Sequence, residues 1–204
     1  MILYHGTSSR YLPEILEYGL QPREYTDVAG NWEGNIQSKP DLVYLTDAYA
    51  LYYALAATKE HEKLVVIQVD VPEEELLPDE DFLAYVQAQQ DGIPLKQVYE
   101  QGTPDPVVNR ELWKQSLEYN GVVSMFDVPL LDILDVRTLN TTDHMEYIMC
   151  GGGDSMPIPM NYRICGAYYR DCLEQLFKHP QGTKLARPDR MSFMNKLGNW
   201  EPVT

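Results

Sequence analysis

Two short apolar runs in this 204-residue chain end in side chains that could do chemistry. Residues 2–7 read ILYHGT and end in His5, Gly6 and Thr7, while residues 42–46 read LVYLT and carry Tyr44. A histidine can hydrogen-bond or exchange protons near neutral pH, a glycine lets a ligand approach the backbone, and a tyrosine offers an aromatic face with a polar tip. We therefore interpret the runs as neighbouring strands that flank a nucleotide pocket.

The elements that position these residues follow from hydrophobic periodicity and helix-end signals. Ser8 and Ser9 are N-cap candidates for a helix over 9–18, and Gly19 follows its end. The pattern further predicts helices at 47–58 (capped by Asp47), 80–91, 109–118 and 166–178, and strands at 2–5, 42–46, 64–69, 122–126 and 133–136. Residues 92–108 contain three prolines and two glycines and indicate a loop.

The segment between the two apolar runs is itself informative. Residues 23–41 are rich in Gly, Asn, Asp, Ser and Pro, with Tyr25 and Trp32 embedded. Loops longer than roughly 12–15 residues in compact domains are usually functional or disordered. The aromatic side chains favour a binding loop, and a surface excursion is the alternative.

Short strands, early helices and several later strands predict an α+β fold with a strongly bent or split, mixed β-sheet and flanking helices. Regular patterning weakens after residue 140. We therefore expect a domain over residues 1–138 and a C-terminal extension over 139–204, whose role the sequence does not indicate.

Composition narrows the setting. Apolar residues make up 44% of the chain, no stretch approaches the roughly 20 apolar residues of a membrane helix, and no secretion leader is visible. Three widely spaced cysteines indicate reduced thiols, so we expect a cytoplasmic protein with no membrane partner. Residues 1–158 carry 9 basic and 27 acidic side chains, a net charge of −18, which disfavours non-specific nucleic-acid binding.

Conventional catalytic signatures are absent from the sequence. The four histidines are scattered and form no zinc motif, and there is no GxSxG, phosphate-loop or dinucleotide fingerprint. The acidic segments 73–75 and 78–81 lack the ligand pattern of a calcium loop, so we interpret them as a solvated connection and expect no metal site.

The sequence LYHGTSSRYLPEILEYGLQP at 3–22, followed by VYLT at 43–46, resembles the amino-terminal half of the ADP-ribosyltransferase superfamily. The closer resemblance is to the branch with a His-Tyr-Glu triad, which includes the poly(ADP-ribose) polymerases. In that branch a first strand ends in His-Gly-Ser/Thr, a helix ends in a Gly-Leu turn, a variable loop covers NAD, and the next strand carries a tyrosine. The resemblance covers residues 1–70 well and 109–137 loosely, and does not extend to 138–204.

The resemblance implies NAD as substrate and a role for each matching residue. His5 would hydrogen-bond a ribose hydroxyl of the adenosine part, and the Gly6 backbone would pair with the nicotinamide amide. Tyr44 would pack in the nicotinamide pocket, with Tyr53 or Tyr52 as the opposite stacking face. Thr7 and Arg23 are candidate ligands for ribose and phosphate.

The third triad member is a glutamate at the start of a late strand, which bonds the 2′-hydroxyl of the nicotinamide ribose. Glu118 precedes the run at 121–123 and is the best match as catalytic residue, with Glu111 as its rival. A carboxylate suits the chemistry, because cleavage of the nicotinamide–ribose bond develops positive charge on the ribose.

The resemblance thus predicts a mono-ADP-ribosyltransferase that modifies a protein or a nucleic acid, such as a bacterial or phage toxin or effector. An antitoxin or other inhibitor protein is then a candidate partner. The alternatives within the same fold are an NAD-dependent RNA 2′-phosphotransferase and an NAD glycohydrolase. A non-catalytic binding module that kept the fold is a further alternative.

Overall fold

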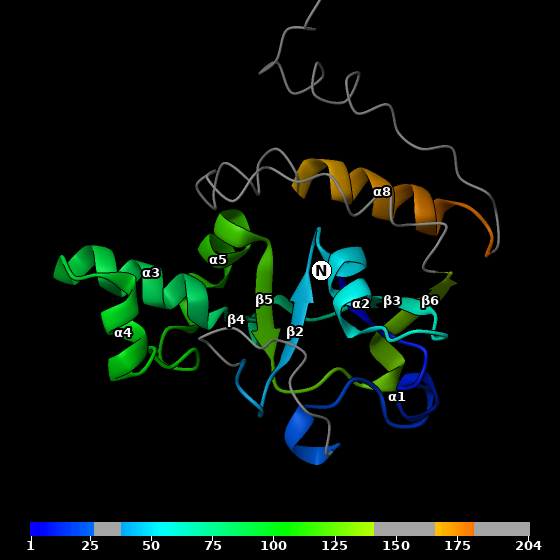
Figure 1. Ribbon diagram of the computed structural model, residues 1–204, viewed down its shortest axis with the longest axis horizontal. Helices are drawn as coiled ribbons and strands as arrows, with labels where there is room; N and C mark the ends of the chain where they lie inside the picture. The colour runs from blue at the N-terminus through cyan, green and yellow to red at the C-terminus, as the bar shows by residue number, and fades with distance from the viewer. Residues whose placement is uncertain (27–37, 141–165, 182–204) are drawn as a thin grey trace, which may run out of the picture.

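A computed structural model describes residues 1–26, 38–140 and 166–181 (Figure 1). Its strands are β1 (Ile2–Ser8), β2 (Val43–Thr46), β3 (Leu64–Asp70), β4 (Leu77–Pro78), β5 (Val122–Met125) and β6 (Ile133–Leu139). Its α-helices are α1 (Leu12–Tyr18), α2 (Ala50–Ala57), α3 (Glu80–Asp91), α4 (Leu95–Gln101), α5 (Trp113–Asn120) and α8 (Ala167–Lys178). Short 3₁₀ turns lie at Arg23–Tyr25, Glu73–Glu75, Arg110–Leu112 and Leu130–Asp132.

The strands form one six-stranded sheet in the order β4-β5-β2-β1-β3-β6. The predicted α+β class is therefore confirmed. The expected mixed sheet is wrong, because every described strand pair is antiparallel.

The sheet is narrowly joined in its middle. Seven residue pairs connect β1 to β3, whereas β1 and β2 are connected by the single pair Tyr4↔Thr46. The strands that carry His5 and Tyr44 are thus neighbours, as the sequence predicts, but they separate beyond this pair. This joint is where the candidate site lies.

Side chains alternate between the two faces of the central strands, so each face buries its own apolar cluster. On one face, α2 and α8 pack on Leu64 and Val66 of β3 (Figure 1). On the other face, Ile15 of α1 and Trp113 of α5 join a cluster that includes Val65 and Ile67. Helix α8, which belongs to the C-terminal extension, therefore completes the core of the preceding residues.

Helices α3 and α4 lie beside β4 and β5, away from α1 and β6 (Figure 1). Ala84, Ala88 and Val98 form a small cluster of their own between these two helices. Helix α3 has the predicted bounds, but the expected loop at 92–108 is wrong in part, because residues 95–101 form α4. None of the described helices is long and apolar enough to span a bilayer.

The first helix starts later than predicted, at Leu12, because the two serines bond elsewhere. The Ser8 hydroxyl donates to Glu62, and Ser9 Oγ accepts from the Lys63 amide. Gly19 does end the helix, with φ of 82° and its N–H on the Ile15 carbonyl. The central part of the predicted binding loop, including Trp32, lies outside the described residues.

Candidate functional site

The end of β1 presents backbone groups toward β2 where the two strands no longer pair. The Ser9 amide donates to the Lys63 carbonyl, and the Met1 carbonyl accepts from Val71, so odd-numbered residues of β1 direct their backbone groups to β3. Alternation in an antiparallel ladder then directs the Gly6 N–H and C=O to β2. The described β1–β2 ladder ends at Tyr4↔Thr46, two residues before Gly6. A donor and an acceptor therefore face the joint.

Helix α2 lies so close to Gly6 that no side chain fits at this position. A Cβ at this position would lie 1.9 Å from the Ala50 carbonyl oxygen and 2.7 Å from the Ala54 amide nitrogen. Both contacts are to helix backbone, which cannot move aside as a side chain can. The close approach is made possible by the small residues Ala50 and Ala54, both fully buried in α2.

His5 bridges the joint through its ring. Its Nδ1 lies 2.9 Å from the Tyr44 carbonyl oxygen. A carbonyl only accepts, so Nδ1 carries the proton and Nε2 is an acceptor in the neutral ring. Burial lowers the pKa of His5, against the smaller raising effect of the Tyr44 carbonyl, so the neutral form is favoured near pH 7. His5 therefore offers an acceptor nitrogen that suits a hydroxyl donor.

Tyr44 connects this joint to a buried carboxylate. Its hydroxyl donates to Glu80 Oε1 at 2.6 Å and accepts from the Lys39 amide at 2.7 Å. The Lys39 amide also lies 3.3 Å from Glu80 Oε1. Burial, followed by the charge of Glu80, raises the pKa of the Tyr44 hydroxyl far above its usual range, so it remains a donor.

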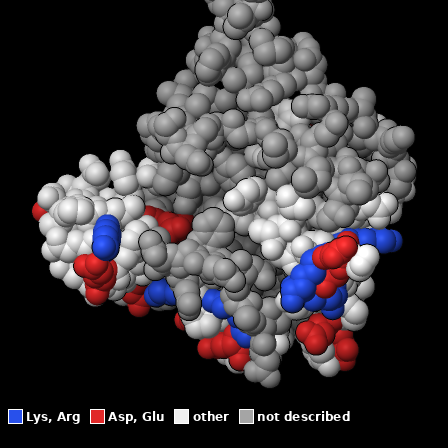
Figure 2. All heavy atoms as spheres, in the orientation of Figure 1, with Lys and Arg blue, Asp and Glu red and all other residues white. Residues whose placement is uncertain are grey.

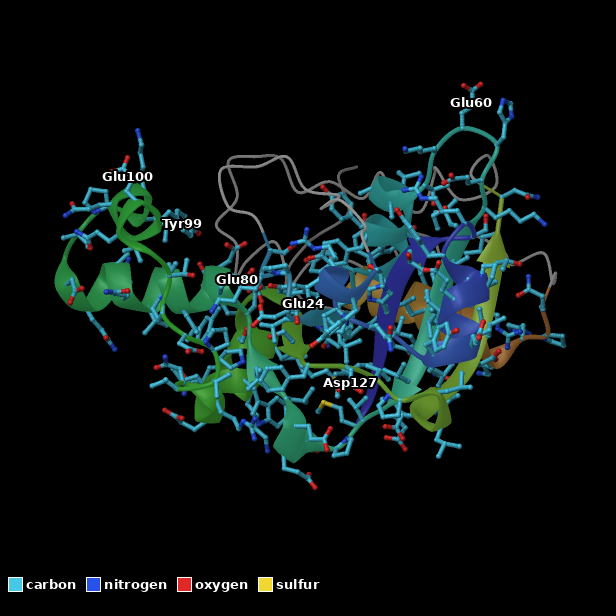
Figure 3. The ribbon with its side chains drawn as sticks, turned by 90° about the horizontal axis from the view of Figure 1, so that it is seen from below. Glu24, Glu60, Glu80, Tyr99, Glu100 and Asp127 are labelled. Atoms are coloured by element: carbon cyan, nitrogen blue, oxygen red, sulfur yellow. The ribbon has the colours of Figure 1, made fainter. Side chains whose placement is uncertain are left out.

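Glu80 is the first residue of α3 and is only 3% exposed (Figure 3). Burial raises the pKa of its carboxyl group, and the hydrogen bond from Tyr44 opposes that rise. Its second oxygen, Oε2, is buried and has no hydrogen-bond partner among the described residues. Buried polar atoms are normally hydrogen-bonded, so Oε2 is an acceptor that still lacks a donor within the described part of the chain.

Asp79 fixes this end of α3 to the start of β5. Asn120 Nδ2 donates to Asp79 Oδ2 at 2.6 Å, and the Asp79 amide donates to Ser116 Oγ at 2.9 Å. Ser116 in turn donates to the Val122 carbonyl, and the Val122 amide donates to Asn120 Oδ1. Burial, and then the charge of Glu80, raises the pKa of Asp79 well above its usual range.

Helix α2 follows β2 in the chain and carries two aromatic side chains, Tyr52 and Tyr53. The Thr46 hydroxyl oxygen accepts from the amides of Ala48 and Tyr49 in the turn before α2. The N-cap residue of α2 is Tyr49 and not the predicted Asp47, and it makes no side-chain capping bond. Tyr53 is partly buried, and both burial and the charge of Asp79 raise the pKa of its hydroxyl. Tyr52 is 40% exposed and meets the Tyr53 ring edge-on at 5.7 Å.

Three other predicted site residues lie apart from these hydrogen bonds. Thr7 is buried opposite Val65. The Arg23 guanidinium bonds the Ser38 carbonyl and hydroxyl at the base of the 27–37 segment. Glu118 is exposed on α5 and its rival Glu111 is exposed as well, and neither bonds to Tyr44 or His5 in the described part of the chain.

The carboxylate that reaches Tyr44 is one that the sequence reasoning missed. The acidic residues at 73–75 are exposed, as expected of a solvated connection, but Asp79 and Glu80 are buried, which contradicts that interpretation. The signal was the apolar run Leu76-Leu77-Pro78, whose last two residues form the edge strand β4 and lead directly into the buried Asp79 and Glu80. Reading all these carboxylates as one charged segment concealed it.

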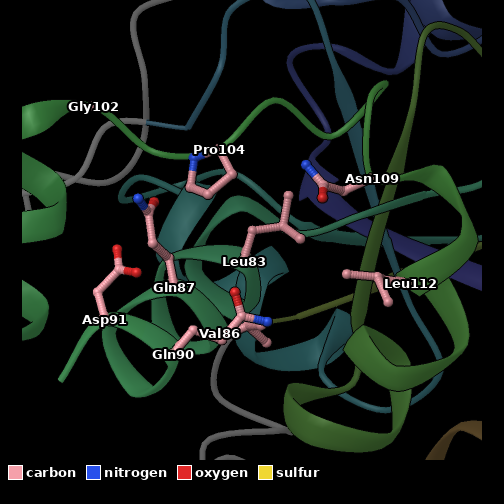
Figure 4. Close-up of a pocket in the computed structure, with 9 residues that line it drawn as sticks. All are labelled: Leu83, Val86, Gln87, Gln90, Asp91, Gly102, Pro104, Asn109 and Leu112. Atoms are coloured by element: carbon pink, nitrogen blue, oxygen red, sulfur yellow. The ribbon is translucent and has the colours of Figure 1, made fainter.

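Two surface cavities lie apart from His5, Tyr44 and Glu80. One of about 440 Å³ lies between α3 and the segment 102–112, with Leu83, Gln87 and Asn109 in its wall (Figure 4). The other, of about 370 Å³, is lined by residues that include Glu24, Tyr25 and Asp127. Neither is lined by His5, Tyr44 or Glu80.

A scan against models of protein families found no match, and a search of curated proteins found no significantly similar sequence. Inference about function therefore relies on the geometry of the joint between β1 and β2.

Proposed function

We propose that this protein is an NAD-dependent mono-ADP-ribosyltransferase, with its site at the joint between β1 and β2. One observation carries the proposal. His5, Tyr44 and Glu80 come from three separate elements, and Tyr44 bonds both of the others, His5 through its backbone carbonyl and Glu80 through its hydroxyl. The order of the first two matches the histidine and tyrosine of the resembling family, and Glu80 supplies the carboxylate.

The residues present suit the parts of NAD. The Gly6 backbone offers a donor and an acceptor, which a nicotinamide carboxamide can match with its own acceptor and donor. The Tyr44 and Tyr53 rings would hold the nicotinamide, and the acceptor nitrogen of His5 would take a ribose hydroxyl. The narrow joint between β1 and β2 supports an ADP-ribosyltransferase-like split sheet.

The chemistry requires charge stabilisation rather than a metal or a nucleophilic side chain. The bond between ribose C1′ and the nicotinamide nitrogen breaks, and its electron pair leaves with neutral nicotinamide. Positive charge develops on the ribose, and an ionised Glu80 next to it would lower the barrier. The acceptor then bonds C1′, and its proton passes to a base or to water. Glu80 takes the role that the sequence predicted for Glu118.

The acceptor is a protein or a nucleic acid. On the described part of the face in Figure 2, basic side chains are interspersed with acidic ones and form no broad patch, which disfavours long nucleic acids held by their phosphates. A role as toxin or effector in the cytoplasm, with an antitoxin or inhibitor protein as partner, belongs to the same proposal.

Product analysis tests the proposal. The purified protein is incubated with adenine-labelled NAD, with and without cell lysate, and with a 2′-phosphorylated RNA. We expect free nicotinamide and label on a macromolecule. Free ADP-ribose alone would indicate a glycohydrolase, and a cyclic phosphate of ADP-ribose would indicate a 2′-phosphotransferase. No cleavage and no NAD binding would indicate a binding module and contradict the proposal.

A further inference from the structure

The Tyr44 hydroxyl has hydrogen-bond partners of its own, which do not involve the face of the Tyr44 ring. The hydroxyl and the Lys39 amide both approach Glu80 Oε1, at 2.6 and 3.3 Å. The same amide donates to the hydroxyl at 2.7 Å, so the three groups form a closed triangle. This geometry fixes one oxygen of the carboxylate and leaves Oε2 without a protein partner in the described residues.

The charges around Glu80 are almost all acidic. Asp79, the N-cap residue of α3, and Asp81 flank it in the chain, and burial also raises the pKa of both. Tyr53 of α2 and Tyr99 of α4 approach these two aspartates, and Tyr119 of α5 approaches Asp81.

No basic side chain forms an ion pair with Asp79 or Glu80 in the described part of the chain. A carboxylate in this setting is ionised only if donors compensate for its burial.

We propose that the Tyr44 hydroxyl is a positioning group that acts through Glu80 by keeping its carboxylate ionised, in addition to any contact that the ring makes. The inference rests on the proposed function, because it assigns ionised Glu80 to NAD cleavage. It divides Tyr44 into two parts: the ring belongs to the nicotinamide pocket, and the hydroxyl acts through Glu80. Loss of the hydroxyl alone should therefore affect turnover through the charge of Glu80.

The test is the pH profile of nicotinamide release by Tyr44→Phe. The hydrogen bond from Tyr44 lowers the pKa of Glu80, so removing it raises that pKa. The acidic limb of kcat should move to higher pH by about one unit, because a hydrogen bond to a charged group contributes to that extent. On the plateau at higher pH the rate should return to near the wild-type value, and KM for NAD should change less than about twofold because the ring remains.

Tyr99→Phe is the matched control. It removes a tyrosine hydroxyl that lies 3.4 Å from Asp81 Oδ1, on the residue next to Glu80. This variant should not move the acidic limb to higher pH. A rate that falls by the same factor at every pH in Tyr44→Phe would overturn the inference, because it would indicate a purely structural hydroxyl.

A second measurement separates this inference from the proposed function. The carboxyl carbon of Glu80 is titrated by ¹³C NMR in the protein without NAD, in wild type and in Tyr44→Phe. A midpoint raised in the variant supports the inference even if the wild-type protein releases no nicotinamide, an outcome that would contradict the proposed function alone. An unchanged midpoint in a folded variant overturns the inference even if NAD is cleaved.

Discussion

Glu80 and Asp79 are consecutive buried carboxyl groups with different hydrogen-bond donors. Glu80 Oε1 accepts from the Tyr44 hydroxyl and the Lys39 amide, whereas Asp79 Oδ2 accepts from the Asn120 side chain. Two carboxyl groups so close in a dry environment do not both ionise readily, so they titrate as a pair. Asp79 also accepts from the Phe82 amide, but burial raises the pKa of Asp79 further than that of Glu80, so the charge is favoured on Glu80 and the proton on Asp79.

This difference predicts how stability depends on pH. The pKa of Asp79 is raised in the folded protein, so the folded state binds the proton more tightly than the unfolded state does. The resulting stabilisation is fully present below the pKa of Asp79 in the unfolded chain, near 3.9. It is lost as pH rises toward the pKa of Asp79 in the folded protein. Asn in place of Asp79 stays neutral and can still accept from Asn120.

Between pH 4 and pH 7, the unfolding free energy of Asp79→Asn should therefore rise relative to that of wild type by more than about 1 kcal/mol. Urea denaturation at a series of pH values measures this difference. Asp91→Asn, at the exposed end of the same helix, serves as control and should show no such trend. A constant difference for Asp79→Asn at all pH values would contradict the raised pKa.

Gly6 gives a second prediction at the scale of one residue. A Cβ there would lie 1.9 Å from the Ala50 carbonyl oxygen, so Gly6→Ala must push α2 away from β1. Overpacking of this kind costs about 1–3 kcal/mol, and thermal denaturation should show a lower Tm. Gly92→Ala is the comparison, because nothing lies within 4 Å of its Cβ and only its φ of 64° is strained. An equal loss in the two variants would argue against the close contact.

At the scale of elements, the hydroxyl of Thr46 fixes the turn from β2 into α2. It accepts from the amides of Ala48 and Tyr49 at 3.1 and 2.9 Å, in the turn that leads into the helix. Thr46→Val should cost about 1 kcal/mol in urea denaturation, and Thr46→Ser, which keeps the oxygen, should recover most of it. A loss in Thr46→Ser with none in Thr46→Val would show that the methyl group, and not the hydroxyl, provides the stability.

The elements also show how far the sequence could be read. The strands at β1, β2, β3, β5 and β6 and the helix α3 were predictable, because their apolar patterns and end signals are local. The start of α1 was not predictable, because Ser8 and Ser9 form hydrogen bonds with Glu62 and Lys63, which are far along the chain. Tyr44 could be matched by its motif, but its bond to Glu80 depends on where a two-residue edge strand pairs.

At the scale of the whole molecule, α8 ties the C-terminal extension to the core of the preceding residues. The family resemblance covers much of those preceding residues but does not reach α8. Leu173 is fully buried in the cluster that contains Leu64 and Val66 of β3. Leu173→Ala should cost about 2–5 kcal/mol, since it leaves a cavity. Leu131→Ala removes the same atoms from a side chain that is 94% exposed and should change stability little. Similar stabilities for the two variants would contradict the packing of α8 on the sheet.

The position of α8 also bears on the candidate site. The same cluster holds Ala50 and Ala54 of α2, the residues that lie against Gly6. Loss of α8 packing should therefore weaken the support of the β1–β2 joint as well as the core. Helix α8 also contacts the joint directly, because the centre of the Phe177 ring lies 5.3 Å from the centre of the ring of Tyr4, the β1 residue that pairs with β2.

The most direct test of the account is the rate of nicotinamide release from NAD by Glu80→Gln, compared with Glu118→Gln and wild type. We expect wild type to release nicotinamide, Glu80→Gln to be slower by about 100-fold or more with NAD binding retained, and Glu118→Gln to be near wild type. Loss of release in Glu118→Gln, with Glu80→Gln unaffected, would return the catalytic role to Glu118. No release by wild type would contradict the NAD chemistry itself.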